Sequence, residues 1–77
     1  MRLDKFLKKS GIIKRRTLAQ EMIERGLVLL NDKEAKPSSS VKIGDKIKVF
    51  FPFKVLIFEV KALEEGDLVK IEGIEQL

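Results

Sequence analysis

The sequence predicts an α+β fold, in which two short N-terminal helices pack on a small antiparallel sheet of four to five strands. The chain has 77 residues, the length of one small domain, so a single domain over residues 1–77 is expected. Apolar residues recur at helical spacing as far as residue 25, and from residue 27 they alternate with polar residues in the manner of strands. Turn dipeptides separate the alternating stretches, which is typical of antiparallel neighbours joined by short connections.

The first predicted helix covers residues 3–9. Its apolar residues have helical spacing and are Leu3, Phe6 and Leu7. Ser10-Gly11 fits a helix end. Lysines at i, i+3 and i+4 form a stripe on the other side, namely Lys5, Lys8 and Lys9. Arg2 extends this basic stripe toward the N-terminus.

The second predicted helix covers residues 17–25. Its apolar face consists of Leu18, Ala19, Met22 and Ile23. Thr17 and Gln20 have the spacing of a capping box, in which the two side chains bond backbone N–H groups at the helix start. Gly26 fits the position just after the helix, where a left-handed backbone conformation is common. Both ends of this helix are therefore marked.

The remaining predicted elements are strands joined by short turns. They are residues 27–30, 33–36, 46–51, 53–60 and 68–74. Asn31-Asp32 predicts a tight hairpin between the first two strands, and Gly44-Asp45 predicts a turn before the third. The fourth strand is the most apolar, so we expect it to be the best buried. Residues 64–67 are expected to turn the chain before the last strand.

The charge is distributed unevenly along the chain. The formal net charge is +4, but residues 1–16 carry seven cations and one anion, whereas residues 49–77 carry three cations and six anions. Such asymmetry predicts one end that binds a polyanion and one end that does not.

The composition argues against several classes of function. The absence of cysteine excludes disulfides and thiolate metal sites, and the absence of histidine removes the commonest metal ligand and general base. We therefore expect no cofactor, no metal and no enzymatic activity. The chain begins with Met, lacks a signal-peptide pattern and has no apolar run approaching ~20 residues, so a cytoplasmic location is expected.

Lys14, Arg15 and Arg16 lie just before the second predicted helix. A helix N-terminus exposes unpaired N–H groups and the positive end of the helix dipole, so three cations there destabilise the free helix. The same arrangement suits an arriving anion, because arginines, lysines and N–H groups together bind phosphate. A basic stripe several phosphates long is the footprint of a nucleic acid. The predicted RNA-binding residues are Arg2, Lys5, Lys9, Lys14, Arg15, Arg16 and Thr17.

Asp4 is the one anion among these cations. We expect its carboxylate to orient Arg2 or Arg16 through a salt bridge and not to contact phosphate itself. The alternative is an ordinary acidic residue at a helix N-terminus. Arg25 is expected to pair with Glu21 and to take no part in RNA binding.

Two further groups of residues leave alternatives open. Ser38–Ser40 either contact RNA backbone or satisfy the hydrogen bonds of their own turn. Four phenylalanines form either the core of the sheet or a platform on which bases stack, and these are Phe50, Phe51, Phe53 and Phe58. The core is the favoured interpretation, because a small sheet needs large apolar side chains.

Residues 1–49 resemble the S-four RNA-binding domain, which is named after a protein of the small ribosomal subunit. The matching pattern is Arg2-Leu3-Asp4, then Arg16, Ala19, Ile23 and Gly26, then Val28 and Asn31, and finally Gly44-Asp45. Arg15 stands where the family usually has Ser, which leaves Thr17 as the expected helix cap and adds a cation. The resemblance implies a fold of the S-four (αL) type, with residues 1–49 as its core motif and residues 50–77 as an additional β-hairpin.

Most S-four domains are appended to larger proteins, but this chain is similar to the stand-alone heat-shock protein fifteen and RqcP types, most of all to the RqcP type. That resemblance implies binding to ribosomal RNA of a large ribosomal subunit stalled with peptidyl-tRNA. It also implies cooperation with an RqcH-type factor that adds C-terminal alanine tails. We expect a monomer away from the ribosome. Other RNA-binding roles stay open, such as an rRNA chaperone or a subunit-assembly factor, as does a protein–protein interaction module.

Overall fold

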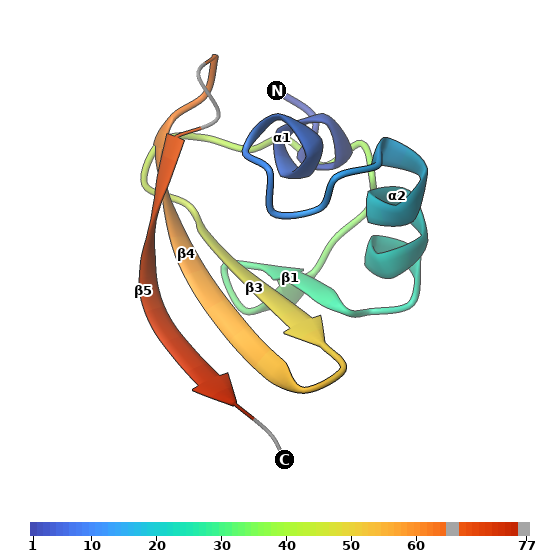
Figure 1. Ribbon diagram of the computed structural model, residues 1–77. Helices are drawn as coiled ribbons and strands as arrows, with labels where there is room; N and C mark the ends of the chain where they lie inside the picture. Colours follow the sequence, from blue (N-terminus) through green and yellow to red (C-terminus); the bar gives the residue numbers. More distant parts are fainter. Residues whose placement is uncertain (65–66, 76–77) are drawn as a thin grey trace.

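The computed structural model describes residues 1–64 and 67–75 and confirms the α+β prediction. The elements in chain order are α1 (Leu3–Lys9), α2 (Arg16–Glu24), β1 (Val28–Leu30), β2 (Lys33–Glu34), β3 (Lys46–Phe51), β4 (Lys54–Ala62) and β5 (Asp67–Glu75). The five strands form one antiparallel sheet in the order β2-β1-β3-β4-β5. The two helices lie next to each other on one side of the curved sheet (Figure 1). Neither described helix has the length and apolar character needed to cross a lipid bilayer.

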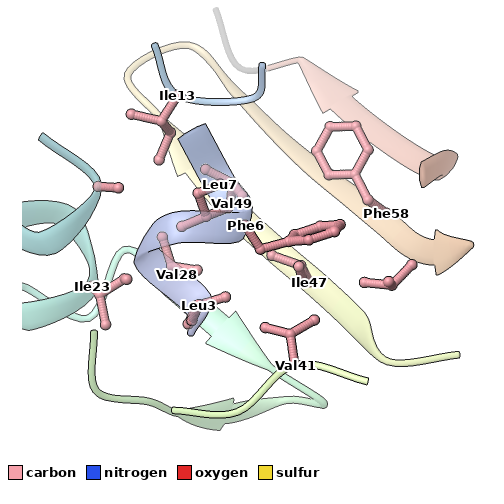
Figure 2. Packing of buried hydrophobic residues seen from close by; sticks show 12 residues of the cluster. Leu3, Phe6, Leu7, Ile13, Ile23, Val28, Val41, Ile47, Val49 and Phe58 are labelled. Carbon is pink, nitrogen blue, oxygen red and sulfur yellow. The ribbon is translucent and has the colours of Figure 1, made fainter. Parts of the chain in front are cut away.

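The core lies between α1 and the inner face of the sheet. Leu3, Phe6 and Leu7 are fully buried, as their helical spacing predicts, and they meet Ile47 and Val49 of β3 (Figure 2). Side chains of α2, β1 and β4 complete the same cluster, among them Ala19, Ile23, Val28 and Phe58. The two helices are thereby fixed on the sheet, and the polar sides of both helices are left at the surface.

Two turns form as the sequence predicts. Asn31 and Asp32 both adopt positive φ, at 52° and 65°, which gives the tight β1–β2 hairpin the twist that matches its strands. The Asn31 side chain also holds this hairpin to β3, because its Nδ2 donates to Asp45 Oδ1 at 3.1 Å and its Oδ1 accepts from the Lys46 N–H at 3.0 Å. Gly44, at φ +92°, provides the predicted turn before β3.

The end of α2 is a Schellman motif, as the position of Gly26 predicts. Gly26 has φ +75°, its N–H donates to the Ile23 carbonyl at 3.0 Å, and the Leu27 N–H donates to the Met22 carbonyl at 2.9 Å. Arg25 pairs with Glu21 one turn earlier at 2.8 Å, as expected.

The last two strands form a long antiparallel pair that bends away from the helices (Figure 1). Register shifts between Ile57 and Phe58 and between Val60 and Ala62 accompany this bend, which is the usual effect of a β-bulge. β4 carries three buried residues (Val55, Phe58 and Val60), more than any other strand whose side chains are described. The turn predicted at residues 64–67 lies partly outside the described residues.

Candidate nucleic-acid interface

Asp4 is the buried centre of the basic end of the molecule. Its side chain has no exposed surface, although it lies in the first turn of α1. The carboxylate accepts five hydrogen bonds: from Lys5 N–H (2.7 Å), Gln20 Nε2 (2.8 Å), Arg2 Nε (3.2 Å), Arg16 Nε (3.2 Å) and Arg2 Nη2 (3.3 Å). A buried carboxylate is tolerated only when its oxygens are bonded in this way. Asp4 therefore joins α1 to α2 and binds both arginines that the sequence offered as alternatives.

These hydrogen bonds also decide the protonation of Asp4. Burial alone would raise the pKa of the carboxyl group, because a charged form loses hydration. The bonds from Gln20, Arg16, the Lys5 N–H and Arg2 outweigh burial and lower the pKa from 3.8 to about 2. Asp4 is thus a fixed negative charge at neutral pH, held between two positive side chains.

Arg2 and Arg16 are oriented by this shared carboxylate. Their side chains remain 49% and 43% exposed, although the Nε atom of each is bonded to Asp4. Arg16 is bonded through Nε and Arg2 through Nε and Nη2, and the other edge of a guanidinium matches the geometry of phosphate. The two arginines lie at the starts of α1 and α2, and their fixed positions suit a phosphate ligand.

The start of α2 differs from the sequence prediction. The helix begins at Arg16, with Arg15 as an extended N-cap residue (φ −121°, ψ 131°) that makes no side-chain cap hydrogen bond. Thr17 is therefore the second helical residue and not the cap, and the predicted Thr17–Gln20 capping box is wrong. The Gln20 side chain is directed to Asp4 instead, and its Nε2 donates at 2.8 Å to this buried carboxylate, which needs hydrogen-bond donors.

The seven predicted RNA-binding residues are all exposed. The structure brings two of them, Arg2 and Arg16, onto one carboxylate. The other five lie on the exposed side of α1, in the connection between the helices and in the first turn of α2, and these are Lys5, Lys9, Lys14, Arg15 and Thr17. Their role in RNA binding stays a prediction.

Gln20 is a participant in this cluster that the sequence prediction missed. Gln20 lies four residues after Arg16, and this spacing in the sequence indicates that both side chains lie on one face of α2. The spacing is compatible with a shared partner for Arg16 and Gln20, and the packing of the two helices shows that this partner is Asp4.

The loop of residues 36–41 supports the start of α1. The N–H groups of Leu3 and Asp4 donate to the carbonyls of Ser39 (2.8 Å) and Pro37 (3.1 Å), which satisfies helix-start donors without a side-chain cap. The Ser39 hydroxyl accepts from the Lys36 N–H at 2.8 Å, so for this serine the turn interpretation holds. The loop thereby fixes the backbone next to Arg2.

The four phenylalanines of the sheet fall into different environments. Phe58 is buried, as the core interpretation predicts, but Phe53 is 74% exposed in the β3–β4 turn, so the core interpretation is wrong for it. Phe50 and Phe51 are half-buried, and the ammonium groups of Lys48 and Lys54 lie 5.3 Å and 5.6 Å from the centres of their rings. These two rings are therefore paired with cations of the same hairpin.

Comparison with known proteins identifies the family of this chain. Residues 1–47 match the S4 domain, the S-four domain named above. The chain is 49% identical over 65 residues to the RQC P-site tRNA stabilizing factor of Bacillus subtilis, covering 84% of this chain and 76% of that protein. It is 39% identical over 77 residues to the protein of the same name from Helicobacter pylori J99, covering all of this chain and 82% of that protein.

A solved structure shares the fold. The trimeric structure of Vibrio cholerae heat shock protein 15 superposes with a TM-score of 0.82 and 30% sequence identity, covering 91% of this chain and 80% of that chain. The family match lies over α1, α2, β1 and β2, the part of the chain that carries Asp4 and both of its arginines. The chain therefore belongs to the S4 domain family, and it shares most of its length with the RQC P-site tRNA stabilizing factors.

Proposed function

We propose that this protein binds ribosomal RNA on large ribosomal subunits stalled with peptidyl-tRNA and holds that tRNA in place during ribosome-associated quality control. The observation that carries the proposal is the pair of half-exposed arginines, Arg2 and Arg16, fixed on buried Asp4. Two such donors on adjoining helices suit consecutive phosphates of an RNA backbone better than a small anion. The name shared by the relatives indicates which RNA is stabilised.

The further parts of the proposal concern partners. An RqcH-type factor would add alanine tails while this protein keeps the tRNA in position, and the protein would act as a monomer in the cytoplasm. The absence of histidine and cysteine and the exposed basic surface support a binding role without catalysis. Residues 50–77, which follow the matched residues 1–47, would form an additional hairpin of the domain.

The test is co-sedimentation of the purified protein with three kinds of particle: large subunits that carry peptidyl-tRNA, vacant large subunits and small subunits. We expect binding to be strongest for the tRNA-bearing large subunit. We also expect the logarithm of the binding constant to fall linearly with the logarithm of the salt concentration. Adding the protein to a tailing reaction with an RqcH-type factor should increase alanine incorporation. The proposal would be contradicted if the protein bound small subunits as tightly as large ones, or if its binding constant did not change with salt concentration.

A second candidate is an rRNA chaperone or subunit-assembly factor, because the same pair of arginines, Arg2 and Arg16, would bind rRNA phosphates on a particle without tRNA. This function differs in the particle that is bound, because an assembly factor would prefer incomplete large subunits without tRNA. The same sedimentation series, extended to such precursors, separates the two functions.

A further inference from the structure

An apolar groove of about 610 Å³ lies between α2 and the β3–β4 hairpin, away from Asp4. Its apolar walls are formed by Ile13, Leu18, Met22, Leu27, Phe51 and Pro52. We propose that this groove binds an acidic amphipathic segment of a partner protein, whose apolar side chains fill it and whose carboxylates meet the cations at its rim. This inference goes beyond the proposed RNA function and does not depend on it.

The first argument is the incomplete cover of α2. The sequence predicts an apolar face of four residues on this helix, and the fold buries only half of it: Ala19 and Ile23 are in the core, whereas Leu18 is 45% exposed and Met22 is half-buried. Leu18 and Met22 are four residues apart and both line the groove. An apolar helix stripe next to a groove of this size is the arrangement that accepts an amphipathic helix.

The second argument is charge. Glu21 and Arg25 line the groove and neutralise each other at 2.8 Å. Lys14 also lines the groove, and the Lys54 ammonium lies 5.6 Å from the ring of Phe51, which is a lining residue. The charged residues of the described lining are Lys14, Glu21 and Arg25, so the lining has a net positive charge, which complements a segment with acidic residues next to its apolar ones.

The third argument favours a polypeptide over an RNA base. Bases stack on free aromatic faces, but the rings of Phe50 and Phe51 already carry lysine ammonium groups at 5.3 Å and 5.6 Å. The lining is aliphatic for the most part, so it offers few partners for the polar edges of a base. Leucine, isoleucine or phenylalanine side chains give up no hydrogen bonds on entering such a groove and bury apolar surface there.

The experiment is an NMR titration of the ¹⁵N-labelled full chain with defined probes. The first probe is a synthetic helical peptide with Leu and Phe at i, i+4 and i+7 and Glu at most other positions. The second has Lys in place of every Glu, and the third is single-stranded oligouridylate. We expect the acidic peptide to shift the amide signals of Leu18, Met22 and Phe51 and to bind at least about tenfold more tightly than the basic peptide.

Variants sharpen the result. Leu18→Glu should lower the affinity for the acidic peptide by about tenfold or more, because it removes an apolar contact and adds a carboxylate that repels the peptide. The matched control is Ile43→Glu, because Ile43 is an apolar residue that is 66% exposed and lies outside the groove. This variant should bind the peptide as tightly as the unmodified protein does. The amide spectrum reports on folding in each sample, and Leu18→Gln repeats the test if Leu18→Glu is poorly folded. Sedimentation of Leu18→Gln with large subunits should be unchanged, because this variant adds no charge next to the RNA surface, so failure here is distinct from failure of the RNA function.

Four outcomes would overturn the inference. The acidic peptide could leave the groove signals unmoved, or the basic peptide could bind equally well. Oligouridylate could move the same signals more strongly, which would make the groove part of the RNA surface. The groove signals could instead shift with protein concentration alone, which would make a second copy of this chain the occupant.

Discussion

The Nε atom of Arg16 lies 3.2 Å from the Oδ2 atom of Asp4, a residue twelve positions earlier whose side chain is completely buried. One contact therefore serves two purposes. It satisfies a buried carboxylate, which fixes α2 against α1, and it sets the direction in which a half-exposed guanidinium faces solvent. Folding and the proposed anion binding are thus linked through the same side chain, and substitutions at either residue are expected to report on both.

Arg16→Ala is expected to weaken large-subunit binding and to destabilise the fold. Each lost charge-assisted hydrogen bond to phosphate costs roughly 1.5–3 kcal/mol of binding, and a buried carboxylate that loses a donor costs about 1–3 kcal/mol of stability. Arg2→Ala should behave similarly. Sedimentation and thermal melts on the same samples give both quantities. Arg25→Ala is the control, since its surface pair with Glu21 contributes little; equal losses from Arg25→Ala and Arg16→Ala would contradict the assignment.

Asp4 makes the stability of the protein sensitive to acid. Its pKa is about 2 in the folded protein and 3.8 without these contacts, so its contribution is present above about pH 4 and is lost as pH falls toward 2. The contribution amounts to at most about 2–3 kcal/mol. Denaturant titrations of the unmodified protein and of Asp4→Asn should show a stability difference that narrows across this window. A difference that is constant from pH 6 to pH 2 would show that Asp4 does not titrate there.

Arg15→Ser is expected to stabilise the fold and to weaken RNA binding. Arg15 is the N-cap of α2 and makes no cap hydrogen bond, whereas serine at that position would accept one from the helix-start N–H groups. The free energy of unfolding should rise by about 0.5–2 kcal/mol, and RNA affinity should fall because a cation is removed. A melt and a salt titration of RNA binding measure the two effects. Unchanged affinity would remove Arg15 from the RNA surface.

Reversal of Lys14 and Arg15 together, both to Glu, should abolish ribosome association and leave the fold intact. Acidic residues next to the start of α2 interact favourably with the helix dipole, so stability should change by no more than about 1 kcal/mol per residue. The control is reversal of Lys61, which pairs with Glu59, together with Lys70 in the acidic end of the chain. If the control variant dissociates from large subunits while the Lys14/Arg15 variant stays bound, the RNA surface lies on the β4–β5 side.

Gly26→Val is expected to destabilise the fold through its backbone alone. A Cβ at this position would meet only the Glu34 Oε1 atom at 3.5 Å, which is an ordinary contact, but the φ of +75° is strained for a β-branched residue. Gly26→Asn should be milder, since asparagine tolerates the left-handed region. Thermal melts of both variants test this order. A Gly26→Val melt that matches the unmodified protein would mean that the turn can rearrange.

The sequence by itself determined the features that depend on neighbouring residues. The two helices, the positive-φ turn at Asn31-Asp32, the glycine that ends α2 and the alternation of β3 all follow from local conformational preferences and short-range hydrogen bonds. The concentration of cations before α2 was also visible, because charge and helix dipole are local properties as well.

The tertiary structure decided how side chains distant in sequence share partners and solvent. Gln20 has the spacing to cap its own helix, but a buried Asp4 carboxylate needs donors, and Gln20 Nε2 supplies one of them from the neighbouring helix. The fold likewise left Leu18 half-exposed and Phe53 at the surface, although both are apolar. A small domain cannot bury every apolar residue. The residues that stay exposed depend on how the helices pack on the sheet, and local sequence patterns carry no information about this packing.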